Sequence, residues 1–180
     1  MNGHPATGNV ERPQFREMSR DEIDALLQRN HVGRVAYARP DGQIEIRQIH
    51  YVYDGDWIFG RTSWNERIES LTRYWWAAFA VDEVDGLFDW RSVVIHGGLY
   101  PLLPEGGPRD IELYRRAVQA LRRLIPETMT QDDPVPFRNL VVGIALQELH
   151  GRAAESRGSV GQEAAPSTDE ARALASSSSQ

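Results

Sequence analysis

Hydrophobic and polar residues alternate over residues 43–53, which is the pattern of a half-buried β-strand. Segments rich in β-forming residues predict strands on either side of it, at residues 32–38 and 57–61, and denser apolar runs predict three more at 75–84, 90–99 and 138–149. Gly42 and Gly55 lie in short polar segments with hairpin-turn chemistry, so the first three strands should form a meander. Near Arg47 the apolar phase shifts by one residue, which indicates either a bulge or a change of exposed face.

Other segments repeat their hydrophobic residues with the period of a helix. Ser19 and Glu22 form a capping box ahead of three spaced apolar residues, which predicts a helix over residues 20–29. Further helices are predicted at 65–73 and at 110–124, the latter stopping before Pro126. Consecutive strands with helices at the periphery predict a mainly β fold with peripheral α-helices, an antiparallel barrel of six or seven strands. A parallel α/β sheet would need a helix between each pair of strands.

The two ends of the chain have little apolar surface. We therefore expect a flexible arm over residues 1–14, one folded domain over residues 15–152, and a disordered Ala/Ser-rich tail over residues 153–180. The first nine residues lack the basic and apolar regions of a signal peptide, so a cytoplasmic location is expected.

Composition excludes several kinds of chemistry. The chain has no Cys, so thiolate nucleophiles and thiolate metal sites are excluded, and its twenty basic residues are all Arg, so Schiff-base lysine chemistry is excluded too. A net charge of −6 argues against nucleic acid as a partner, and no apolar run is long enough to cross a membrane. The five His residues are scattered without metal-ligand spacing, so no metal site is predicted, although strands could bring His50 and His96 together.

The end of the third predicted strand carries a candidate anion site. Arg61, Thr62 and Ser63 are followed by Arg67 at the start of a predicted helix. Backbone N–H groups at a helix start, hydroxyls and guanidinium groups all suit phosphate oxygens. Arg47 could lie beside Arg61 across the hairpin, where an anion would offset the repulsion between the two cations. The alternative is that Thr62 is an ordinary helix cap and Arg67 lies on a solvated face.

Two further groups of polar residues admit both a functional and a structural interpretation. Trp90, Arg91 and Ser92 combine a flat ring, a fork of donors and a hydroxyl, which suits the edge and face of a ring system, whereas a Trp at a strand start is often part of the core. The acidic residues 82–85 are interpreted as solvated groups rather than as an acid–base pair. His50 could be a general base or a polar residue on the barrel rim.

Three stretches together resemble the pyridoxamine 5′-phosphate oxidase-like family of flavin-nucleotide-binding proteins, in the branch that includes nitroimidazole reductases. They are residues 49–63, 81–84 and 90–97, and the similarity extends over about residues 18–152. The resemblance implies the FMN-binding split barrel, commonly a homodimer with FMN at the subunit interface.

The resemblance also implies which residues bind the cofactor. The flavin phosphate and ribityl chain are assigned to Arg61, Thr62, Ser63 and Arg67. The strand along the isoalloxazine ring is assigned to Arg47, Gln48 and Ile49. The polar edge of the ring is assigned to Trp90, Arg91 and Ser92, which the partner subunit could supply. Asn65 and Arg67 depart from the Gly and Lys usual in the family. A His that some nitroimidazole reductases use aligns near Arg61, which argues against nitroreductase activity.

The resulting hypothesis is an FMN-dependent oxidoreductase that acts on an unidentified small molecule, with an electron donor such as NAD(P)H. No catalytic side chain is identified. The alternatives are a flavin carrier or sensor without turnover, a haem-binding relative with His50, His96 or His150 as ligand, and a deazaflavin-dependent reductase.

Overall fold

The computed structural model describes residues 13–39, 41–63 and 76–155. Within these residues there are two helices, α1 (Arg20–Arg29) and α2 (Pro108–Leu121). The strands there are β1 (Gln14–Glu17), β2 (Val32–Ala38), β3 (Ile44–Tyr53), β4 (Trp57–Thr62), β5 (Trp76–Gly86), β6 (Asp89–Leu102) and β7 (Leu140–Glu155). No helix of the described part is both long and apolar enough to span a membrane.

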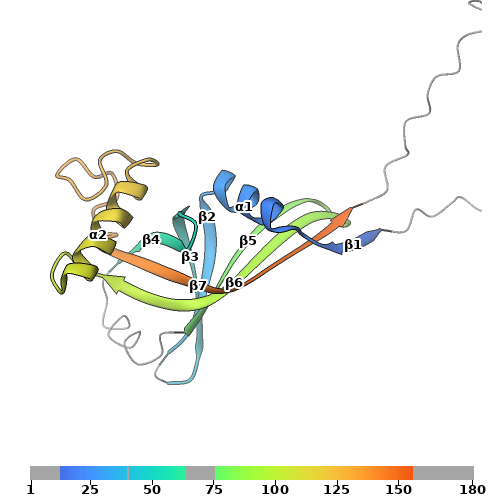
Figure 1. The fold of residues 1–180 in the computed structure, drawn as a ribbon, viewed down its shortest axis with the longest axis horizontal. Helices are drawn as coiled ribbons and strands as arrows, with labels where there is room; N and C mark the ends of the chain where they lie inside the picture. The colour runs from blue at the N-terminus through green and yellow to red at the C-terminus, as the bar shows by residue number, and fades with distance from the viewer. Residues whose placement is uncertain (1–12, 40, 64–75, 156–180) are drawn as a thin grey trace, which may run out of the picture.

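The strands form one antiparallel sheet that closes on itself. Their order is β1-β7-β4-β3-β2-β5-β6, and an additional pairing between β6 and β7 joins the two sides. Figure 1 shows β6 and β7, the longest strands, running along the molecule, with α2 at one end, β1 at the other and α1 between them. The prediction of a mainly β, antiparallel split barrel of six or seven strands with peripheral helices is confirmed.

The predicted elements match the observed ones best where local signals are strong. The bounds of α1 and β2 agree with the prediction, and Ser19 forms the complete capping box with Glu22. β7 runs six residues beyond its predicted end because Ala153 and Ala154 are buried and pair with β1 and β6. β1 was not predicted, and its pairing with β7 holds this short segment in the sheet. The predicted helix at 65–73 lies outside the described residues.

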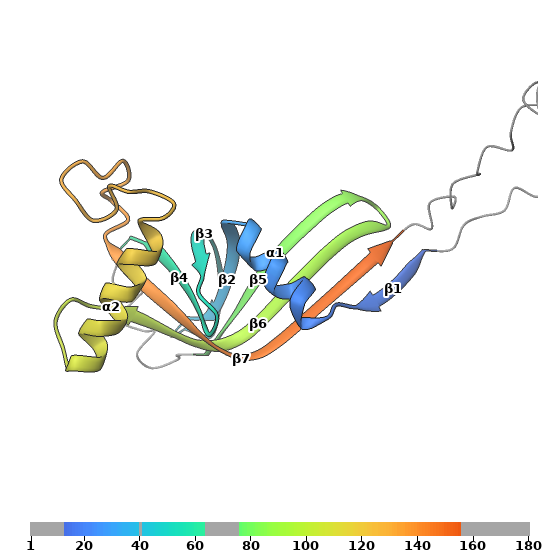
Figure 2. The ribbon, with the colours of Figure 1, turned by 45° about the horizontal axis from the view of Figure 1, so that its top comes forward.

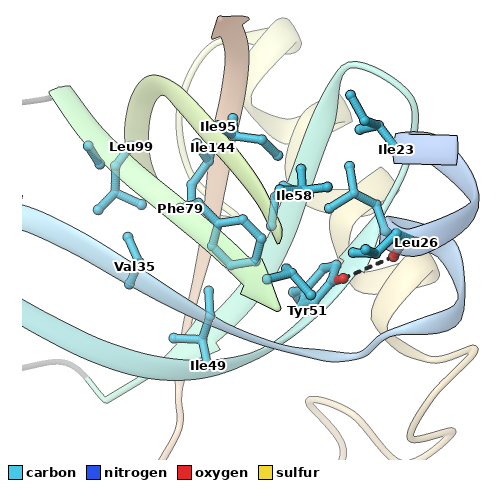
Figure 3. Close-up of a cluster of buried hydrophobic side chains, with 14 of the residues drawn as sticks. Ile23, Leu26, Val35, Ile49, Tyr51, Ile58, Phe79, Ile95, Leu99 and Ile144 are labelled. Carbon is cyan, nitrogen blue, oxygen red and sulfur yellow. Dashed lines mark hydrogen bonds between the residues drawn. The ribbon is translucent and has the colours of Figure 1, made fainter. Parts of the chain in front are cut away.

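The barrel interior is filled by apolar side chains from every long strand. The rings of Tyr51 and Phe79 meet edge to face with centroids 5.0 Å apart, and the Tyr51 hydroxyl donates a hydrogen bond to the Leu27 carbonyl at 3.0 Å. Burial raises the pKa of Tyr51, which keeps the phenol neutral as a donor. Figure 3 shows these side chains converging between the sheet and α1, which closes this end of the core with Ile23 and Leu26.

A second apolar cluster lies on the outside of the barrel under α2. Ala117, Val118 and Leu121 of the helix pack with Phe59 of β4 and Val141 of β7. β4 is therefore buried on both faces, which explains why its sequence is apolar without strict alternation.

The phase shift in β3 is a change of exposed face. Its pairing with β2 continues without interruption from Val32↔His50 to Ala38↔Ile44, so no bulge is present there. Ile49 is buried, whereas Ile44 and Ile46 are 67% and 65% exposed on the outer surface. Ile44 and Ile46 therefore form a small exposed apolar patch at the start of β3.

Candidate functional site

Trp90 and Ser92, at the start of β6, line a cavity of about 450 Å³ between this strand, β7 and β1. His150 and Arg152 of β7 contribute polar groups to its wall, and Met18 contributes an apolar one. The volume and the mixed lining are typical of a site for a small organic ligand.

A row of polar residues crosses the strands beside this cavity. Asp82 of β5 accepts hydrogen bonds from the Ser92 hydroxyl at 2.6 Å and from the Arg34 guanidinium at 2.7 Å. The next residue, Glu83, points to the opposite face and binds Arg29 at the end of α1, which lowers the pKa of Glu83. Asp82 and Glu83 therefore do not form a carboxylate pair.

Arg61, predicted to bind the flavin phosphate, lies in a buried ion pair. Its Nη2 and Nη1 donate to the two carboxylate oxygens of Asp133 at 2.6 and 3.2 Å, and its Nε donates to the Arg138 carbonyl at 2.9 Å. The side chains of Arg61 and Asp133 are only 5% and 2% exposed. Most of the N–H groups of Arg61 are thus already engaged with the loop between α2 and β7.

Asp133 organises that loop around the guanidinium. Its carboxylate also accepts the backbone N–H groups of Met129 at 2.7 Å and of Val135 at 3.0 Å. The hydrogen bonds from Arg61 are the main reason that the pKa of Asp133 falls to about 2, and the backbone donors add to this effect. The carboxylate therefore stays ionised although it is buried.

The other predicted phosphate residues lie at or beyond the end of β4. Thr62 is the last residue of the strand and pairs with Leu140, and Ser63 follows it with intermediate exposure. Arg67 lies outside the described residues.

The three residues predicted to run along the flavin ring belong to β3. Ile49 is buried against Gly60 of β4, and Gln48 is exposed opposite Arg34. Arg47 forms an ion pair with Glu45, with 2.5 Å between its Nη2 and the Oε1 of the carboxylate. β3 and β4 pair from Tyr51↔Gly60 to Tyr53↔Ile58, and the Arg47–Ile49 segment precedes these pairs on the side where β4 ends.

Trp90, Arg91 and Ser92 lie far from the end of β4 within one chain. Arg61 pairs with Val141 near the start of β7, whereas Ser92 pairs with Arg152 near its other end. Those two β7 residues are eleven positions apart, roughly 35 Å of strand at about 3.3 Å per residue. Figure 2 shows the same separation, with α2 beside one end of β7 and β1 beside the other. Within the described residues, one chain therefore does not bring the Trp90–Ser92 group to the end of β4 that carries Arg61 and Thr62.

The structure also reveals a cluster that was not predicted from the sequence. His96 of β6 lies beside Glu148 and His150 of β7, on the strands that border the cavity. Glu148 and His150 are two positions apart in a strand and so share a face, which is the signal that the sequence contained. The sequence suggested that strands could bring His50 and His96 together. In the structure, the His50 ring lies next to the Arg138 guanidinium instead.

Comparison with known proteins identifies relatives of this chain. A family profile described as pyridoxamine 5′-phosphate oxidase matches residues 19–153. Among curated proteins, no sequence matches significantly.

Several solved structures share the fold. A FAD-binding protein from Mesorhizobium loti has a TM-score of 0.60 and 22% identity, covering 79% of this chain and 98% of its own. A 5-nitroimidazole antibiotic resistance protein from Bacteroides thetaiotaomicron, named as putative, has a TM-score of 0.58 and 14% identity, covering 79% and 89%. A FAD- and haem-binding protein from Mycobacterium smegmatis has a TM-score of 0.55 and 21% identity, covering 78% and 72%. At these identities the likeness establishes a common fold.

Proposed function

Because this chain belongs to the pyridoxamine 5′-phosphate oxidase family, we propose that it binds FMN and acts as a flavin-dependent oxidoreductase on a small molecule. NAD(P)H is the proposed electron donor. The observation that carries the proposal is the match over residues 19–153, which includes α1 and nearly the whole barrel with all three groups of predicted flavin residues. Relatives in fold that are named for FAD binding support a flavin as the ligand.

The cavity at the start of β6 is the proposed position of the isoalloxazine ring. Trp90 offers a flat aromatic surface and Ser92 a hydroxyl, and both line the cavity of about 450 Å³. Such a site would orient the ring and exclude water from one side of it. When bound, the flavin would accept and pass on two electrons.

The phosphate would lie at the other end of β7, near the end of β4. The Arg61 charge is already compensated by Asp133, so its proposed part is to hold the end of β4 in place. Thr62, Ser63 and Arg67 are then the groups proposed to contact the phosphate itself. Because Asp133 neutralises the charge of Arg61, Arg67 would be the residue that supplies positive charge to the phosphate.

A homodimer is proposed as the functional unit. The two groups of flavin residues are separated along β7 within one chain, so a complete site requires the ring group of one copy and the phosphate group of another. The exposed apolar side chains of Ile44 and Ile46 on β3 supply surface that a second copy would bury.

The first experiment identifies the cofactor. The purified chain is incubated in turn with FMN, FAD, a deazaflavin and haemin, freed of excess ligand, and its absorbance spectrum is recorded. Retention of FMN with a two-band flavin spectrum, at one FMN per chain in a dimer, is the expected result. If the chain retains haemin with an intense Soret band and does not retain FMN, its ligand is haem and not flavin. Retention of none of the four would refute the proposal.

Variants then test the two ends of the site separately. Trp90→Ala and Arg67→Ala should each weaken FMN binding by roughly 1–3 kcal/mol, the scale of stacking and charge-assisted hydrogen bonds. Arg109→Ala, which removes an exposed Arg on α2, is the matched control and should leave affinity unchanged. Arg61 is unsuitable for this purpose because its loss would disturb folding.

Turnover requires a separate measurement. Anaerobic mixing of the FMN-loaded protein with NADH or NADPH should bleach the flavin absorbance, and admission of an electron acceptor should restore it. A protein that binds FMN but is not reduced by either nucleotide would be a flavin carrier or sensor rather than an oxidoreductase.

A further inference from the structure

Two imidazoles and one carboxylate converge on the paired strands β6 and β7. The nitrogen and oxygen atoms of His96, Glu148 and His150 that could bind a metal lie within 4.8 Å of one another. The rings of His96 and His150 are 6.3 Å apart between centroids and meet edge to face. The Nδ1 atom of His96 is 3.6 Å from a carboxylate oxygen of Glu148.

Strand register creates this cluster. His96 pairs with Glu148, and Val94 pairs with His150, so all three polar side chains project from the same face. The register changes directly after this pair, because Gly97 pairs with Leu146 and leaves Gln147 as the extra residue of a bulge. Without the bulge, His96 would face Gln147, an amide that binds metals poorly.

One atom in the cluster lacks a partner. The Nδ1 of His96 is buried, although its ring is partly exposed, and it makes no hydrogen bond within the described part of the chain. A buried ring nitrogen normally has a hydrogen-bond partner or a metal, because an unsatisfied one costs free energy. The carboxylate of Glu148, at 3.6 Å, lies beyond hydrogen-bond distance. The separation of 3.6 Å between this nitrogen and the carboxylate oxygen is close to the distance between two ligand atoms bound to one metal ion.

We propose that His96, Glu148 and His150 bind a divalent transition-metal ion, with zinc as the best fit. Imidazole ligands favour transition metals over magnesium and calcium, which prefer oxygen ligands alone. Two His and one carboxylate are also a known zinc ligand set in which a fourth position is open to water or to another ligand.

The ligand atoms of the three side chains already lie close to the spacing that zinc requires. Zinc–ligand bonds of about 2.0–2.2 Å place the ligand atoms about 3.3 Å apart, so the cluster must contract by roughly 1.5 Å at most. The side chain of Glu148 is 59% exposed, and its carboxylate oxygen is already within 3.6 Å of the Nδ1 of His96. His150 also lines the cavity of about 450 Å³, so the open coordination position would be accessible from the cavity.

This inference does not rest on the flavin proposal, because zinc binding needs no flavin. The experiment uses the full chain without an affinity tag, treated with a chelator and then dialysed. Titration with zinc chloride by isothermal calorimetry measures stoichiometry and affinity, and cobalt(II) serves as a coloured probe of coordination geometry. The unfolding temperature with and without zinc is a second measure of binding.

The expected result is one zinc ion per chain and a cobalt spectrum typical of tetrahedral coordination. His96→Ala, Glu148→Gln and His150→Ala should each weaken zinc binding at least about tenfold and abolish the zinc-dependent rise in unfolding temperature. His31→Ala, which removes an exposed imidazole outside the cluster, should bind like the parent chain. Circular dichroism confirms the fold of each variant, and His150→Gln replaces His150→Ala if the latter fails to fold.

Two results would overturn the inference. One is a parent chain that binds no zinc. The other is a set of folded cluster variants that bind zinc as tightly as the parent, which would place any bound ion elsewhere and leave His96 and Glu148 as a simple imidazole–carboxylate pair.

Discussion

Replacement of Asp133 by Ala should be among the most destabilising single changes in the loop between α2 and β7. The carboxylate accepts four hydrogen bonds, two from Arg61 and one each from the backbone N–H groups of Met129 and Val135. Asp133→Ala removes all four and leaves the guanidinium buried without a counter-charge. Met129 has a positive φ of 58°, a conformation that non-glycine residues adopt only when the surroundings enforce it.

The magnitude follows from the burial of the pair. Removal of one partner from a buried ion pair costs about 3–5 kcal/mol, because the remaining charge is desolvated and unpaired. Arg61 would keep its hydrogen bonds to the carbonyls of Arg138 and Val135. These partly solvate the cation, so we expect a loss of about 3 kcal/mol in the free energy of unfolding.

Urea denaturation followed by circular dichroism measures this loss. Asp132→Ala is the matched control, since its side chain is the exposed neighbour, and it should change stability by less than about 0.5 kcal/mol. The double variant Arg61→Leu/Asp133→Leu removes both charges and should cost less than the sum of the single variants, because neither charge remains unpaired.

The dependence on pH gives a second test. The pKa of Asp133 is about 2 in the folded chain against an ordinary value of 3.8, so its ionisation stabilises the fold above about pH 4. This stabilisation is lost as the pH falls from 4 towards 2. The difference between the parent chain and Asp133→Ala should therefore shrink over that range. A difference below 1 kcal/mol at pH 7, or one that stays constant down to pH 2, would refute the reasoning.

Three further changes test the fold. A Cβ at Gly97 would overlap the backbone carbonyl of Ala145 at the bulge, so Gly97→Ala should cost about 2–4 kcal/mol in urea denaturation, whereas Gly86→Ala meets only ordinary contacts and should cost far less. Ser19→Ala removes the N-cap of α1 and should cost about 1 kcal/mol; an unchanged urea midpoint would contradict the capping role. Tyr51→Phe leaves the Leu27 carbonyl without its buried donor and should cost about 1–2 kcal/mol, with no change in the far-ultraviolet spectrum.

Local patterns in the sequence were sufficient to predict most of the framework. The capping box of Ser19 and the turn glycines Gly42 and Gly55, which both have positive φ, specify their elements through interactions within a few residues. Alternation in β3 and the apolar runs of the later strands are local properties of the sequence too, so these strands were predicted for the same reason. The combination of three separated motifs was specific enough to predict the family as well.

Tertiary structure decided what depends on contacts between distant segments. No local signal shows that Arg61, predicted as an anion-binding residue, pairs in the fold with Asp133, seventy-two residues later. β1 and the end of β7 form strands because they pair with each other, although they lie near opposite ends of the sequence. Likewise, the bulge beside Gly97 determines that His96 faces Glu148, and strand register cannot be derived from either strand alone.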